Sequence, residues 1–150
     1  MNNKKKNRFI LIATALIILL LTINRYRPRY LTDYMKEEDF NSLYIIKYEM
    51  NNNRSQQIEI HDQKQIQDIY NYIAEQKVRR KVKWSSLLRV EDGITYSVHF
   101  VGSPNKPNCF INLIGDDYII LQDPYDDKST TFVYVDSKID LEYFKELITD

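Results

Sequence analysis

The sequence predicts an α+β protein, with an N-terminal transmembrane helix and a small domain built on a mainly antiparallel sheet. One amphipathic helix packs on that sheet, and a short helix ends the chain. Three observations predict this class: residues 9–23 form an uncharged apolar run, strand-like runs follow one another without regular strand–helix alternation, and two segments carry apolar residues at helical spacing. Of the 150 residues, about 120 remain for a single domain.

The apolar run contains only two polar side chains, Thr14 and Thr22, so a helix here has almost no polar face and belongs in lipid. Its fifteen residues reach about 22 Å, so flanking residues complete a ~30 Å span. No small-residue cleavage site follows the run, which favours an uncleaved signal anchor over a removed signal peptide. The expected organisation is a cytoplasmic N-terminus at 1–8, a transmembrane signal anchor at 9–24, a juxtamembrane connector at 25–40 and an extracytoplasmic domain at 41–150.

The charges that flank the anchor predict its orientation. Three lysines, one arginine and the amino terminus precede it, against three arginines after it, and the more positive side stays in the cytoplasm. The domain is therefore expected outside the cell. Arginine and tyrosine side chains suit the lipid head-group region, either as a simple membrane-proximal collar, which we favour, or for selective recognition of anionic lipid. The predicted membrane-interface residues are Arg25, Tyr26, Arg27, Arg29 and Tyr30.

The first elements of the domain follow in order. Residues 30–40 predict a short helix capped by Thr32 or Asp33. Residues 42–50 and 56–60 predict two strands that form a hairpin through the asparagines between them. Next comes a helix that begins with Asp62 and Gln65 in a capping-box-like pattern. Its apolar face consists of Ile66, Ile69, Tyr70 and Ile73.

The second half predicts four more strands and a final helix. The strand-like runs cover residues 94–101, 110–114, 118–121 and 131–135. Residues 115–117 join the middle two as a tight hairpin. Apolar residues at 94, 96, 98 and 100 alternate with polar ones, so this strand has one dry face and one wet face. The final helix begins near Asp140, with an apolar stripe of Leu141, Phe144, Leu147 and Ile148.

The charge distribution bears on possible partners. Residues 31–150 carry 14 basic and 21 acidic side chains, a net charge of −7, which argues against nucleic-acid binding. A basic stretch at 77–84 is the exception. It is a candidate site for an anionic partner, formed by Arg79, Arg80, Lys81, Lys83 and Trp84. The favoured alternative is a solvated edge strand in which Val82 and Trp84 point inward.

No pattern of residues predicts catalysis, a cofactor or a metal. The acidic loops at 116–117 and 123–127 lack EF-hand spacing, and Asp beside Pro or Gly is ordinary turn chemistry. Cys109 opens a predicted strand, and His61 and His99 show no zinc-ligand spacing. The three glycines stand alone, so no phosphate-binding loop is predicted.

The remaining signal is tyrosine, of which the chain has twelve, and tyrosine is enriched at protein interfaces. We therefore expect a membrane-anchored binding or interaction protein of the bacterial envelope, with the bilayer around residues 9–24 and another envelope protein or peptide as partners. This organisation resembles that of the many small membrane-tethered proteins of Gram-positive bacteria. The alternative is a weakly recognisable envelope hydrolase, which a pocket lined by His99, Cys109 and an acid would favour.

The anchor is tested on the protein isolated from cells. We expect the chain to keep its amino terminus and to stay in the membrane through a carbonate wash, because residues 9–24 remain in the bilayer. Protease added to cells without their wall should digest residues 31–150. A soluble form that begins near Asn24 or Arg25 would contradict the anchor, and a protected domain would contradict the orientation.

Overall fold

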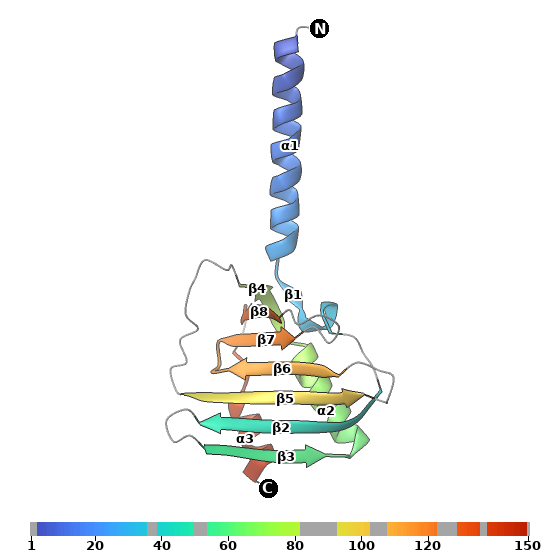
Figure 1. Ribbon diagram of the computed structural model, residues 1–150, viewed down its shortest axis with the longest axis vertical. Helices are drawn as coiled ribbons and strands as arrows, with labels where there is room; N and C mark the ends of the chain where they lie inside the picture. The colour runs from blue at the N-terminus through green and yellow to red at the C-terminus, as the bar shows by residue number, and fades with distance from the viewer. Residues whose placement is uncertain are drawn as a thin grey trace.

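The computed structural model describes residues 3–35, 39–49, 54–81, 93–102, 108–122, 129–135 and 138–149. These residues form one eight-stranded antiparallel sheet, in the order β1-β4-β8-β7-β6-β5-β2-β3, with an apolar helix at the N-terminus (Figure 1). The α+β class is confirmed. The elements are α1 (Asn3–Tyr26), β1 (Arg29–Tyr30), the 3-10 helix η1 (Leu31–Asp33), β2 (Phe40–Glu49), β3 (Arg54–Ile60), α2 (Gln63–Ala74), β4 (Lys77–Arg80), β5 (Ile94–Gly102), β6 (Cys109–Ile114), β7 (Tyr118–Gln122), β8 (Ser129–Tyr134) and α3 (Leu141–Thr149).

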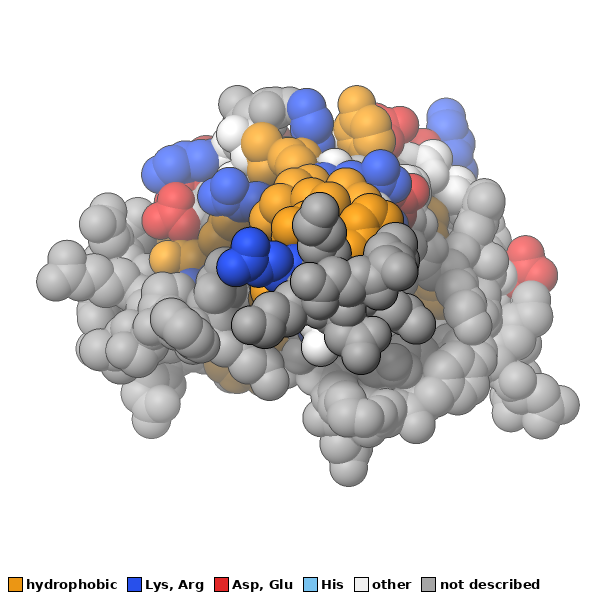
Figure 2. Space-filling view, turned by 90° about the horizontal axis from the view of Figure 1, so that it is seen from above, with side chains coloured by type: hydrophobic (Ala, Val, Ile, Leu, Met, Phe, Trp, Pro, Cys, Tyr) orange, Lys and Arg blue, Asp and Glu red, His pale blue; other side chains and the backbone are white. Residues whose placement is uncertain are grey.

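Helix α1 projects away from the domain and is long and apolar enough to cross a bilayer. The segment Asn7–Tyr26 has 20 residues and a mean hydropathy of 2.1, and none of it is buried in the domain. At ~1.5 Å per residue it spans about 30 Å, the thickness of a hydrocarbon core. A signal sequence meets the same criteria. Seen from above in Figure 2, apolar side chains lie at the centre, and several Lys, Arg, Asp and Glu side chains lie beyond them.

The segment that follows α1 joins the sheet. The short helix expected in residues 30–40 is a 3-10 helix of three residues, whose N-cap is Tyr30 without a side-chain capping bond. Leu31 is fully buried, and its N–H donates to the carbonyl of Gln76 at 2.9 Å. Met35 is buried as well. The packed domain therefore includes part of the expected connector, while residues 36–38 lie outside the described residues.

The hairpin and the first domain helix are confirmed. Strands β2 and β3 pair antiparallel, from Leu43 opposite Ile60 to Glu49 opposite Arg54. Asp62 is the N-cap of helix α2, and its carboxylate accepts a hydrogen bond from the Gln65 N–H at 2.7 Å. This bond satisfies one of the N–H groups that a helix leaves without partners at its start. The predicted apolar face, Ile66, Ile69, Tyr70 and Ile73, is buried.

Strands β5 to β8 form a continuous antiparallel run, as the strand-like segments predict. The hairpin between β6 and β7 turns at Gly115, which has a φ of 53°, a conformation that glycine adopts at no steric cost. Helix α3 is confirmed too. Its Phe144 is fully buried, and the centroid of that ring lies 5.7 Å from the centroid of Tyr96 on β5.

Strand β4 corrects the edge-strand interpretation of residues 77–84. It lies inside the sheet, with β1 on one side and β8 on the other. Val78 is fully buried because both neighbours and the core cover it. The pairing with β1 involves only two residues of each strand, a contact too short to leave a periodic signal in the sequence. Val82, Lys83 and Trp84 lie outside the described residues.

Both domain helices cover the same face of the sheet, behind the strands in Figure 1. Alternate residues of the strands point into this core, including Leu43, Ile45, Val98, Ile111 and Phe132. The residues between them point to the other side, which no described helix covers. We call that side the open face. Its apolar and aromatic side chains are Tyr44, Ile46, Tyr48, Val101, Phe110, Ile114, Tyr118, Ile120 and Val133.

Leu31→Ala tests whether the segment after α1 belongs to the core. We expect the free energy of unfolding to fall by about 2–5 kcal/mol, because the substitution leaves a cavity at a fully buried site. Denaturant unfolding of the full chain in detergent measures this change. The exposed neighbour Thr32 provides the control, since Thr32→Ala should change stability by less than about 0.5 kcal/mol. Equal effects of the two substitutions would mean that Leu31 does not anchor this segment.

Candidate functional site

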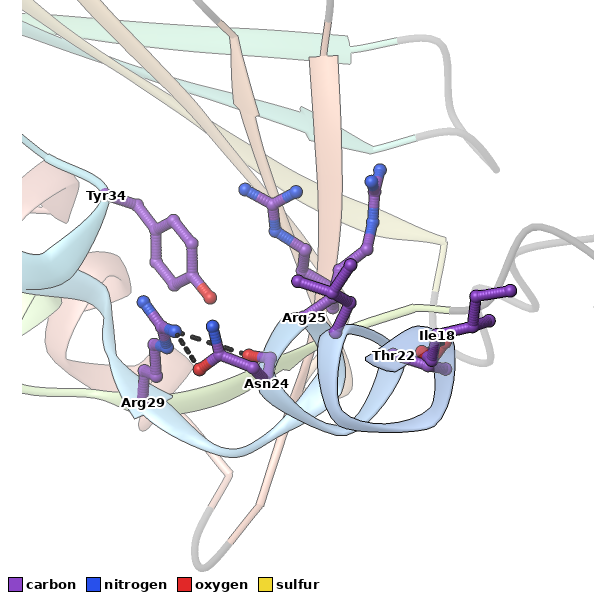
Figure 3. Close-up of a pocket in the computed structure, with 8 residues that line it drawn as sticks. Ile18, Thr22, Asn24, Arg25, Arg29 and Tyr34 are labelled. Atoms are coloured by element: carbon purple, nitrogen blue, oxygen red, sulfur yellow. Dashed lines mark hydrogen bonds between the residues drawn. The ribbon is translucent and has the colours of Figure 1, made fainter. Parts of the chain in front are cut away.

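A cavity of about 510 Å³ opens where α1 meets the domain (Figure 3). We call it the junction pocket. Three separate parts of the chain build it: the last turns of α1, the segment of β1 and η1, and β4. Its lining residues are Ile18, Leu21, Thr22, Asn24, Arg25, Arg29, Tyr34 and Arg80. It therefore brings together Arg25 and Arg29, two of the predicted membrane-interface residues, with Arg80, one of the predicted anionic-partner residues.

Arg29 connects β1 to the end of α1. Its Nη2 donates to Oδ1 of Asn24 at 2.9 Å and to the Asn24 carbonyl at 3.3 Å, as the dashed lines in Figure 3 show. The last carbonyls of a helix have no partners within the helix, and a basic side chain satisfies them well. The Nε atom of Arg29 is buried and has no hydrogen-bond partner among the described residues. One donor of this guanidinium is therefore left for another acceptor.

Arg80 enters the pocket from β4. Its guanidinium carbon lies 5.2 Å from the centroid of the Tyr34 ring, a cation–π distance. The Tyr34 ring in turn packs on Phe132 of β8, with ring centroids 4.7 Å apart. Arg80 pairs with Phe132 across the two strands, so it points to the same side of the sheet as the core. This packing sets where the charge of Arg80 lies.

The pocket concentrates positive charge. Arg25, Arg29 and Arg80 line one cavity, and none of them forms an ion pair with a carboxylate of the described residues. The C-terminal end of α1 contributes an opposing charge of only about −0.5. Three full positive charges outweigh it, so the pocket is suited to an anion.

The other predicted site residues lie elsewhere. Tyr26, Arg27 and Tyr30 do not line the pocket. Arg79 and Lys81 alternate with Arg80 along β4 and so point to the open face, where Nζ of Lys81 lies 4.4 Å from the ring centroid of Tyr118. Lys83 and Trp84 are not among the described residues. Asn24 and Tyr34 were missed, because a helix-end amide and a lone tyrosine give no distinctive pattern.

The open face carries its own polar contacts. Tyr44 on β2 donates to the Glu59 carboxylate on β3, and this hydrogen bond raises the pKa of the Tyr44 hydroxyl. Ser97 donates to the side-chain oxygen of Asn112 on the neighbouring strand. The His99 ring packs edge-on against Phe110, with centroids 4.8 Å apart, and burial lowers the pKa of the imidazole. These contacts tie neighbouring strands together on this face.

The candidates for catalysis are not brought together. Cys109 packs toward the core, whereas the next residue, Phe110, points to the open face with His99. Cys109 and His99 are therefore on opposite faces of the sheet. Lys138, which precedes α3, contacts the hairpin between β6 and β7: its Nζ lies 2.7 Å from Asp116 and 3.4 Å from Asp117, and the hydrogen bond to Asp116 raises the pKa of the lysine.

Across the parts of the chain that the structure describes, no group of three or more His, Cys, Asp or Glu side chains is placed to hold a metal ion. The acidic loop at 123–127 lies outside those parts. No family model, curated protein or solved structure matches this chain.

His99 generates a prediction about pH. Burial favours its neutral form, so the unfolded chain binds a proton more readily than the folded chain does. The stabilising contribution is complete above the ordinary pKa of about 6.5 and is lost as the pH falls below that value toward the lowered folded pKa. Thermal unfolding of the full chain in detergent between pH 7.5 and 5.5 should show a smaller loss of stability in His99→Gln than in the native chain.

The exposed His61 is the matched control, since 70% of its side chain is accessible to solvent. His61→Gln should keep the acid-induced loss of stability that the native chain shows. If the native chain and His99→Gln lose stability in parallel over this pH range, burial of His99 is not the cause.

Proposed function

We propose that this protein is a single-pass membrane protein that binds another envelope protein or peptide outside the cell and catalyses no reaction. Its N-terminus is cytoplasmic, and α1 anchors the domain to the outer side of the membrane. The apolar 20-residue segment, none of which is buried in the domain, supports the anchor, and the excess of positive charge on its N-terminal side supports this orientation. Such an exposed apolar helix is stable in lipid and is poorly suited to water.

The observation that carries the binding function is the open face. Apolar and aromatic side chains from five neighbouring strands, β2, β5, β6, β7 and β8, lie next to one another on it, and no described helix covers them. Most of them are half-buried by their neighbours, and Tyr48 is 44% exposed. Soluble domains rarely expose a large continuous apolar patch unless it contacts a partner. Tyrosine suits such a surface because it offers both apolar area and a hydroxyl group.

The chemistry of the domain supports binding over the alternative, an envelope hydrolase. Nucleophilic hydrolysis needs a nucleophile and a base within hydrogen-bond reach, about 2.6–3.2 Å. Cys109 and His99, which would favour a hydrolase if they lined one pocket with an acid, point to opposite faces of the sheet. The open face instead carries tyrosines, and its hydrogen bonds from Tyr44 to Glu59 and from Ser97 to Asn112 join neighbouring strands. Such a surface suits contact with a partner.

Photo-crosslinking in intact cells tests the proposal. A photoreactive phenylalanine analogue replaces Tyr118 or Phe110 on the open face, and Lys64 or Asp68 on α2 serves as the control. We expect adducts of defined mass from the open-face positions, because a bound partner lies within reach of them. An adduct that adds the chain's own 18.0 kDa identifies a second copy as the partner, and another mass identifies a different envelope protein.

The α2 positions are more exposed than Tyr118 and Phe110 but lie on the helix layer, so they should give no such adduct. The same adducts from both sets of positions would reflect random collision at the membrane. The absence of any adduct from the open face would contradict this binding function.

A further inference from the structure

We infer that the junction pocket binds the phosphodiester head group of an anionic phospholipid in the outer leaflet. The inference rests on the proposed function only in that α1 must lie in a bilayer; it is independent of the partner on the open face. With α1 across the membrane, the C-terminal end of the helix and the adjoining edge of the domain lie at the level of the head groups (Figure 1). The pocket opens at this level.

The polar half of the pocket has the chemistry of a phosphate site. Arg25, Arg29 and Arg80 come from three elements, and no described carboxylate neutralises them. A guanidinium presents several N–H donors in a planar fork that matches the oxygens of a phosphate. The buried Nε of Arg29 has no described acceptor, and a phosphate oxygen would supply one.

The other half of the pocket is apolar, and this favours a lipid over a small soluble anion. Ile18 and Leu21 line it, and their side chains are 59% and 64% exposed in the structure. Ile18 lies seven residues before Arg25, which places it about 10 Å higher along the helix. The pocket therefore runs from an apolar wall on the membrane side to guanidinium groups on the domain side. A phospholipid has the same order, from acyl chain to phosphate.

Binding of an anionic head group depends on the arrangement of the pocket residues, because the domain as a whole repels anions. Residues 31–150 carry a net charge of −7, so no general attraction to an anionic surface is expected. Arg25 and the apolar wall belong to α1. A domain that lacks α1 has only part of the pocket and should not bind anionic vesicles.

The test uses the full chain in detergent and compares phosphatidylglycerol with phosphatidylcholine by native mass spectrometry. We expect one tightly retained phosphatidylglycerol per chain. The pocket variant Arg25→Gln with Arg80→Gln should weaken its retention roughly 30-fold, the combined factor expected when two arginine contacts near an anionic head group are lost. The matched control, Arg27→Gln with Arg79→Gln, removes the same charge at neighbouring positions outside the pocket and should retain the lipid as the native chain does.

Three results would overturn the inference: no preference for phosphatidylglycerol, equal losses in the pocket and control variants, or displacement of the lipid by excess inorganic phosphate, which would identify a soluble anion as the ligand. If the double variant does not fold, the single variant Arg25→Gln tests lipid retention instead. The Arg25 side chain is exposed, so its replacement should leave the fold intact. Flotation of the native chain with phosphatidylcholine vesicles separates the two proposals. A chain that does not float contradicts the anchor, and one that floats without lipid preference contradicts only the pocket.

Discussion

The packing of α2 and α3 against a single face of the sheet is the interaction on which the rest of the structure depends. Aromatic rings form much of this contact: Tyr70 of α2 packs on Phe100, and Phe144 of α3 packs on Tyr96, with both pairs of centroids 5.7 Å apart. Each buried aromatic side chain contributes about 1.5–3 kcal/mol through loss of apolar surface from water. Because successive residues of a strand point to opposite sides, this one-sided core also determines which side chains make up the open face.

The elements that were predicted correctly are those with local causes. Asp62 and Gln65 are three residues apart and bond to each other at the start of α2. Gly115 provides the φ of 53° that the hairpin between β6 and β7 requires. The alternation in β5 is visible in the sequence because its apolar residues Tyr96, Val98 and Phe100 all belong to the core, whereas the residues between them are polar. In each case the physical reason lies within a few residues, so a pattern in the sequence is sufficient to find it.

The junction pocket has no such local cause. It exists because β1, two residues long, pairs with β4, which brings Arg29 opposite Val78 and places Arg80 nearby. A buried Val78 is compatible with an edge strand or an internal strand, so the sequence alone did not distinguish them. The basic stretch is also divided by strand alternation. Arg80 faces the pocket, whereas Lys81 lies over Tyr118 on the open face, so one run of charge in the sequence becomes two surfaces.

The short connection between α1 and β1 has a mechanical consequence. Only Arg27 and Pro28 separate the helix from the sheet, the proline ring restricts the backbone, and Arg29 bonds back to Asn24. The strands lie across the direction of α1 and follow one another away from it (Figure 1). Eight strands at a spacing of about 4.8 Å extend about 34 Å from first to last. With α1 in a bilayer, this extent fixes how far the domain reaches from the membrane surface. Any partner of the domain must therefore come within about 34 Å of the membrane.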